Sequence, residues 1–128
     1  MKLILITLSS VIMLSSCSTS IQTQVGNDKD KHGCIASAGY TWSEVRKDCI
    51  RTFETGIRLN NVTDANATTS AFIVFSSDSS KAELFLPSPV NNPILKKSAN
   101  SWKEKTFELK KENGKLSLYK KGKLIYQE

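Results

Sequence analysis

The sequence predicts a mainly β fold, namely a small antiparallel meander or barrel of about six to eight strands with a short N-terminal helix tied by a disulfide. Three observations support this. The second half of the chain holds short runs in which apolar and polar residues alternate, as in half-buried strands. Turn residues separate the runs, and Asn113-Gly114 is the strongest hairpin signal because both residues tolerate positive φ. Ahead of the runs, Cys34 and Cys49 enclose a segment with helical spacing.

The chain divides into four predicted segments. These are a lipoprotein signal peptide at 1–16, a flexible tether at 17–31, a helical module with Cys34 and Cys49 at 32–52, and an antiparallel β domain at 53–128. With 128 residues in all, the chain is long enough for one domain with a modest core. The tether is predicted because its residues are polar and show no hydrophobic period.

The leader determines the expected location. Lys2 precedes an apolar run at 3–14, which is too short to cross about 30 Å of hydrocarbon and is therefore typical of an export signal. The run ends in Leu14-Ser15-Ser16-Cys17, which resembles the lipobox of bacterial lipoproteins. That resemblance implies cleavage before Cys17, a diacylglycerol on its sulfur, an acylated amine, and anchoring in the bacterial cell envelope, at the outer membrane facing the periplasm. The alternative is a plain secretory signal beside a chance cysteine.

Two cysteines remain once the lipidated one is set aside, and an exported chain meets an oxidising compartment. Cys34 and Cys49 are therefore expected to form a disulfide that closes a loop of about 15 residues. Trp42, Val45 and Cys49 are spaced to share one face of a short helix that ends at Cys49. We expect Trp42 to pack this module onto the sheet rather than to bind sugar.

Seven runs carry the strand pattern. They are 53–59, 71–75, 81–86, 94–97, 106–110, 115–119 and 123–126. Phe53, Ile57 and Leu59 are expected core residues in the first run, and Ala82, Leu84 and Leu86 are expected to face inward in the third. The prolines within 87–93 predict an irregular connection, because proline cannot donate to a central ladder. Residues 98–105 are expected to form a polar excursion that holds one large apolar residue, Trp102.

The region from Ala71 to the C-terminus resembles the domain of membrane-bound inhibitors of c-type lysozyme, which are small periplasmic lipoproteins built as eight-stranded antiparallel barrels. The runs that carry the likeness are 71–75, 81–87, 94–97, 98–102, 107–111 and 115–119. In that family a serine and a lysine from two loops reach the catalytic acids of lysozyme. The resemblance implies that Ser98 is this serine, that Trp102 replaces a loop tyrosine, and that Lys110 or Lys111 is nearest the lysine.

The chain also departs from that family's pattern. Glu112 stands where the motif lysine stands, and the loop glycine is missing because Ser98-Ala99 is followed by Asn100-Ser101. The family's terminal cysteine pair is absent and the module at 32–52 is added. Trp102 therefore has a second interpretation, as a lid over one end of a barrel.

The charge is uneven along the chain. The formal net charge is +6, and from Lys81 to Glu128 eleven lysines oppose five glutamates. Such an excess can indicate nucleic acid as a partner, but an exported chain rarely meets it and the aromatic residues form no stacking motif. Anionic envelope glycan, or an acidic face on another protein, is the expected partner. The alternative is a basic surface that serves solubility alone.

No catalytic constellation is recognisable in the sequence. His32 is the single histidine, no glycine-rich phosphate loop follows a strand, and neither a metal site nor a cofactor is expected. The sequence therefore predicts a binding protein rather than an enzyme. Its first function hypothesis is an envelope-anchored lipoprotein with a lysozyme-inhibitor-like domain, held to the membrane through Cys17. The second is a structural or adaptor lipoprotein that binds anionic glycan or an outer-membrane complex.

Overall fold

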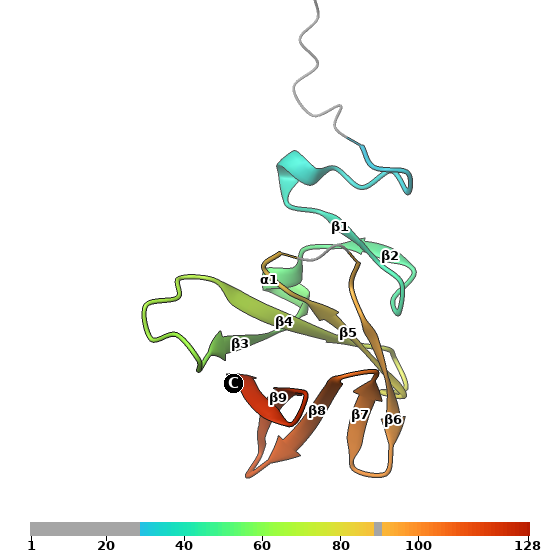
Figure 1. Ribbon diagram of the computed structural model, residues 1–128. Coiled ribbons are helices and arrows are strands. Elements are labelled where there is room, and N and C mark those ends of the chain that lie inside the picture. Colours follow the sequence, from blue (N-terminus) through green and yellow to red (C-terminus); the bar gives the residue numbers. More distant parts are fainter. Residues whose placement is uncertain (1–28, 89–90) are drawn as a thin grey trace, which may run out of the picture.

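The fold is a closed antiparallel β-barrel that carries a small disulfide-bonded module on its outer face (Figure 1). In this computed structural model, residues 29–88 and 91–128 are described. The predicted signal peptide at 1–16, the predicted lipid attachment at Cys17 and most of the predicted tether lie outside those ranges.

Eight strands form the barrel, which confirms the predicted antiparallel architecture. Each strand pairs antiparallel with the next along the chain, and the last pairs with the first. They are β3 (Ile57–Asn61), β4 (Ser70–Phe75), β5 (Lys81–Phe85), β6 (Ile94–Ser98), β7 (Ser101–Glu104), β8 (Phe107–Glu112), β9 (Lys115–Lys120) and β10 (Lys123–Gln127). Closure removes the free edges of this sheet, where another chain could otherwise add a strand.

Side chains fill the interior of the barrel. Inward residues alternate with outward ones along each strand. The large inward residues with essentially no exposed surface are Leu59, Ile73, Leu84, Leu95, Leu109 and Leu118. Burial of each such side chain stabilises the fold by about 1.5–3 kcal/mol. The expected inward positions Ala82 and Leu84 are confirmed.

The connections gather at the two ends of the barrel. We call one the hairpin end. It holds the β4–β5 turn at 76–80, the β6–β7 turn at 99–100, the β8–β9 turn at 113–114 and Glu128. The opposite end holds the turns at 105–106 and 121–122, the connection 62–69, and the described residues 86–88 and 91–93 between β5 and β6. Asn113 and Gly114 adopt φ values of 52° and 80°, as the Asn-Gly hairpin signal predicts.

The predicted disulfide is present, but the predicted helix in the module is wrong. Cys34 and Cys49 are bonded, with their Cα atoms 5.5 Å apart. The segment expected to be helical instead forms a hairpin of β1 (Thr41–Ser43) and β2 (Asp48–Ile50), in which Trp42 lies opposite Cys49. So short a helix is unstable in water, and the Lys47 N–H donates to the Ser43 carbonyl to close a turn. The helical content of the module is one 3₁₀ turn, η1 (Ala36–Ala38).

The barrel also begins later than predicted. Residues expected to start the first strand form one turn of helix, α1 (Thr52–Thr55), and β3 starts at Ile57. Phe53 is 60% exposed, so its expected place in the core is wrong, whereas Leu59 is fully buried as expected. Gly56 permits the tight exit from α1, because a Cβ there would lie 2.7 Å from the Thr52 carbonyl oxygen.

The polar excursion predicted at 98–105 contains a strand, β7, so that prediction is wrong as well. Its flanking turns have two residues each, and their first residues are Ala99 at φ 55° and Lys105 at φ 47°. These left-handed positions normally hold glycine or asparagine. The usual turn signal was therefore missing on both sides of the strand.

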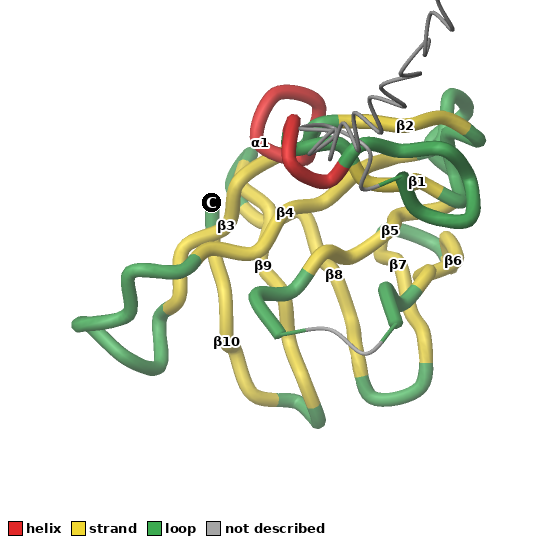
Figure 2. The backbone as a smooth tube through the Cα atoms, turned by 90° about the horizontal axis from the view of Figure 1, so that it is seen from above, coloured by secondary structure: helices red, strands yellow, loops and turns green. Residues whose placement is uncertain are grey.

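The module covers the outer face of β4 and β5. Figure 2 shows β1, β2 and α1 lying alongside these two strands. Ile50 from β2 packs with Val74 and Phe85 from the barrel in a second apolar cluster, outside the barrel interior. Because β4 is covered on both faces, its sequence is a continuous apolar run rather than an alternating one.

Candidate functional site

The structure brings the four residues predicted for binding to the hairpin end. Ser98 ends β6, Trp102 lies on β7, and Lys110 and Lys111 lie on β8. Ser98, Lys110 and Lys111 line one depression of about 330 Å³. Trp102 and Lys111 line a second, of about 370 Å³, at the mouth of the barrel. Lys111 belongs to both, so the two depressions form one continuous candidate surface.

Lys110 and Lys111 serve different parts of this surface, because successive strand residues point to opposite faces. The Lys110 ammonium lies on the outer wall, 3.9 Å from Glu108 Oε2 and 5.0 Å from the centre of the Tyr119 ring. The Tyr119 hydroxyl donates to Glu112 Oε2 at 3.0 Å. That hydrogen bond raises the pKa of Tyr119, so the hydroxyl keeps its proton beside Lys110.

Lys111 and Lys97 contribute positive charge at the mouth. Both line it, and its walls include the apolar side chains of Ile57, Phe75 and Leu116. The Lys97 ammonium lies 5.8 Å from the centre of the Trp102 ring, a cation–π distance. Within the described ranges, neither lysine forms an ion pair, and both remain available to an anionic group of a partner.

Trp102 lies beneath the mouth rather than on its rim. Its side chain is 8% exposed, and its indole N–H donates to the Ser79 carbonyl at 2.8 Å. Its ring packs against Phe75 with centroids 4.9 Å apart. Trp102 therefore closes the end of the core, which agrees with its interpretation as a lid.

The carboxylates of the hairpin end are engaged in local contacts. Glu128 Oε2 accepts from the Leu116 N–H at 3.1 Å, and Glu112 Oε2 accepts from the Tyr119 hydroxyl at 3.0 Å. Asp78 accepts from the Ser80 backbone N–H and from two serine hydroxyls, and these bonds lower its pKa to about 2. These carboxylates are thus already hydrogen-bonded to neighbouring groups, whereas Lys97 and Lys111 have no acidic partner among the described residues.

The remaining basic residues do not form one patch with this surface. Lys120, Lys121 and Lys123 surround the β9–β10 turn at the opposite end, where the Lys120 ammonium lies 5.4 Å from the Phe107 ring. The lysine excess of the C-terminal half is therefore divided between the two ends. A partner that needs one broad basic face would have to span the length of the barrel.

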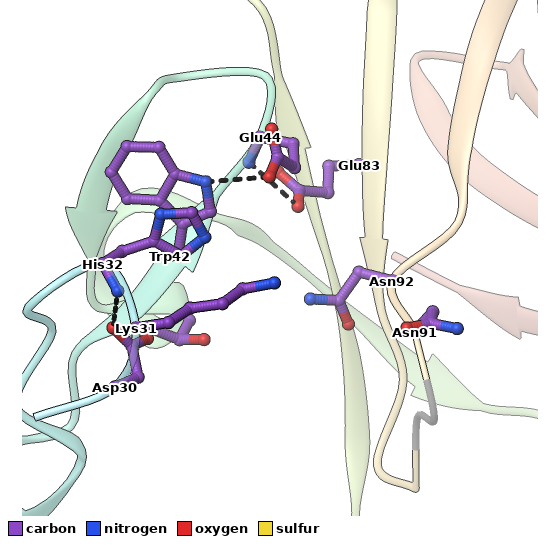
Figure 3. A pocket seen from close by; sticks show the side chains of 9 residues that line it. Asp30, Lys31, His32, Trp42, Glu44, Glu83, Asn91 and Asn92 are labelled. Atoms are coloured by element: carbon purple, nitrogen blue, oxygen red, sulfur yellow. Dashed lines mark hydrogen bonds between the residues drawn. The ribbon is translucent and has the colours of Figure 1, made fainter. Parts of the chain in front are cut away.

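A third cavity, which the sequence patterns did not predict, lies at the seam between the module and the barrel (Figure 3). Trp42 was expected to pack the module onto the sheet rather than to bind sugar. It instead stacks on His32, with ring centroids 4.2 Å apart and planes 7° from parallel, while Ile50 packs the module onto the barrel. Glu83 is 1% exposed, although a glutamate at an outward position of an alternating strand normally faces water. Its carboxylate accepts from the Ser43 hydroxyl at 2.6 Å and holds the β1–β2 turn on the barrel.

The described part of the chain shows few other features of chemical interest. Across residues 29–88 and 91–128, no group of three histidine, cysteine or acidic residues is placed to hold a metal ion. None of the helices in those ranges has the length and apolar character that a bilayer crossing requires. Comparison of the chain with protein-family models, curated proteins and solved structures found no match.

Proposed function

We propose that the protein is a lipid-anchored binding protein of the bacterial envelope, whose hairpin end engages the carboxylates of a lysozyme. The observation that supports this is the joint placement of Ser98, Lys110 and Lys111 around one depression. A hydroxyl and an ammonium at a protruding turn can satisfy two acids in a cleft. The anchor rests on the likeness of the leader to a lipobox, with Cys17 as the lipidated residue.

Short-range contacts, and not net charge, would stabilise this complex. The chain carries a formal charge of +6, and lysozyme is itself positive, so long-range forces oppose the encounter. Each hydrogen bond to a charged group contributes about 1.5–3 kcal/mol. Added salt screens the repulsion, and we therefore expect inhibition to persist or strengthen as ionic strength rises.

A turbidity assay with c-type lysozyme and bacterial cell walls tests the proposal. The chain from residue 18 onward should inhibit at micromolar concentration. Lys111→Gln should weaken inhibition about tenfold, because one lost charged hydrogen bond of about 1.5 kcal/mol corresponds to that factor. Lys121→Gln is the matched control, since it removes the same charge at the opposite end. An absence of inhibition at tens of micromolar, or an equal effect of both variants, would reject this site.

The second candidate function is that of an adaptor that binds anionic envelope glycan. The lysine excess supports it, with Lys110 and Lys111 near one end and Lys120 and Lys121 at the other. Retention on lipopolysaccharide or peptidoglycan should then fall when these four lysines are replaced by glutamine, and should fall with salt. Retention that survives the replacement would refute this version. The opposite responses to salt separate the two candidates.

A further inference from the structure

The seam cavity has about 340 Å³ and two contrasting walls. The module contributes the stacked rings of His32 and Trp42, and the chain just before β6 contributes Asn91 and Asn92 (Figure 3). A volume of this size is at the lower end of the range typical of small-molecule sites. The cavity shares no lining residue with the two depressions of the hairpin end.

The carboxylates around the cavity already have donors. Glu83 accepts from the Ser43 hydroxyl and, at 3.2 and 3.4 Å, from the backbone N–H groups of Glu44 and Val45. Glu44 accepts from the Lys47 ammonium at 2.6 Å and from the Trp42 indole N–H at 3.0 Å, and these bonds lower the pKa of Glu44. The carboxylates therefore shape the cavity and fix the indole, and they leave little bonding capacity for a ligand.

One buried polar atom at the cavity lacks a partner among the described residues. Asn92 Oδ1 is buried and accepts no hydrogen bond from the residues that the structure describes. A buried acceptor of this kind normally has a donor, supplied by the protein, by water or by a ligand. The Lys31 side chain extends across the cavity toward Asn92 (Figure 3). A ligand placed here would meet an acceptor and an ammonium donor at once.

Charge selects the class of ligand. Asp30, Glu44 and Glu83 contribute three negative charges, whereas Lys31 and the paired Lys47 contribute two positive ones, so the surroundings carry −1. An anion would be repelled by the three carboxylates. A cation would find those carboxylates occupied, since Asp30 also accepts from the backbone N–H groups of His32 and Cys34, and it would meet the Lys31 ammonium. A neutral molecule with many hydroxyl groups meets neither obstacle.

We infer that the seam cavity binds a neutral saccharide. One sugar ring lies against the His32–Trp42 pair, because the positively polarised C–H face of a pyranose is attracted to the negative face of an aromatic ring. One hydroxyl donates to Asn92 Oδ1, and another accepts from the Lys31 ammonium. This site is independent of the proposed action on lysozyme, since the hairpin end takes no part in it.

The test is a titration of the full-length chain, held in a non-glycosidic detergent, with chitotriose and with cellotriose. Amide resonances of residues 30–32, 41–44 and 91–92 should shift, with dissociation constants in the millimolar range that a few hydrogen bonds and one stacked ring support. Asn92→Ala should weaken binding about tenfold, whereas Asn66→Ala in the 62–69 loop should not change it. His32→Ala should weaken binding similarly, and His32→Phe should restore it by keeping a ring on Trp42.

Several outcomes would overturn the inference. The first is that no resonance moves with either saccharide, which would mean that water alone satisfies Asn92. The second is that the shifts cluster at Trp102 and Lys111, which would place the sugar at the hairpin end. The third is that lysine amide, used as a cationic probe, binds and the saccharides do not. The lysozyme assay distinguishes the two proposals, because Asn92→Ala should leave inhibition unchanged and Lys111→Gln should leave saccharide binding unchanged.

Discussion

Replacement of Glu83 should detach the module from the barrel while leaving the barrel closed. Glu83 points outward from β5, and its carboxylate is the acceptor for three donors of the β1–β2 turn. The 2.6 Å bond from Ser43 is the short one, and both Glu83 and Ser43 are fully buried. Water therefore cannot replace the lost acceptor without opening the seam.

The magnitude follows from the geometry of these bonds. In Glu83→Gln the side chain keeps its size, but an amide N–H₂ must face at least one donor, and the charge is lost. A hydrogen bond to a charged group contributes about 1.5–3 kcal/mol, and an unsatisfied buried donor costs a similar amount. The two backbone bonds are long and add less. We expect a loss of about 2–3 kcal/mol in the free energy of unfolding.

Urea unfolding of Glu83→Gln, Ser43→Ala and the double variant measures this directly. The coupling energy in the double-mutant cycle should be about 1–2 kcal/mol, because the two side chains share one short bond. Hydrogen exchange should show amides of residues 41–50 losing protection before those of β8 and β9. Glu108→Gln is the matched control, since its ion pairs are exposed and should change stability by less than about 0.5 kcal/mol. A coupling energy near zero would refute the assignment of Glu83 as the clamp.

Three further predictions concern stability. Replacing Cys34 and Cys49 by serine opens a bond of sequence separation 15 and should lower the free energy of unfolding, measured in urea, by about 3 kcal/mol. Asp78 has a folded pKa of about 2 against 3.8 for the free group, so its contribution is present above pH 3.8 and is lost as the pH falls through 2. In Asp78→Asn the free energy of unfolding should therefore fall less steeply as the pH drops from 3.8 to 2. An unchanged slope would contradict the lowered pKa. Ala99→Gly should stabilise the protein by up to about 1 kcal/mol because φ is 55° there, whereas Ala67→Gly in a loop should not.

The barrel could be predicted because its strands obey a local rule. The strand patterns identified seven of the eight barrel strands, and Asn113-Gly114 identified one of the turns. The strand that contains Trp102 was not predicted, because both neighbouring turns place residues other than glycine or asparagine at positive φ. The bounds of β3 were missed because Phe53 is exposed on α1 although it is apolar. Each wrong prediction can therefore be traced to a residue whose local preference is overridden by the tertiary structure.

The module was harder to predict because its structure depends on the barrel. The spacing of Trp42, Val45 and Cys49 is compatible with a helix and also with a hairpin. The hairpin is selected by its hydrogen bond to Glu83, some forty positions away in the sequence. Nothing in an alternating strand distinguishes a glutamate that faces water from one that caps another segment's turn. The His32–Trp42 pair likewise requires the hairpin and the disulfide to be in place first.

The packing of the barrel restricts where this protein can bind anything. A barrel of eight strands has room inside for side chains or for one small ligand, and here Leu59, Leu84, Leu109 and their neighbours already fill it. Binding must therefore take place at an end or on the outer wall. The outer wall of a barrel is convex, and a small ligand needs a concave surface. The module supplies that concavity by resting on β4 and β5, so the disulfide and Glu83 that hold it there are expected to be as necessary for ligand binding as the residues that touch the ligand.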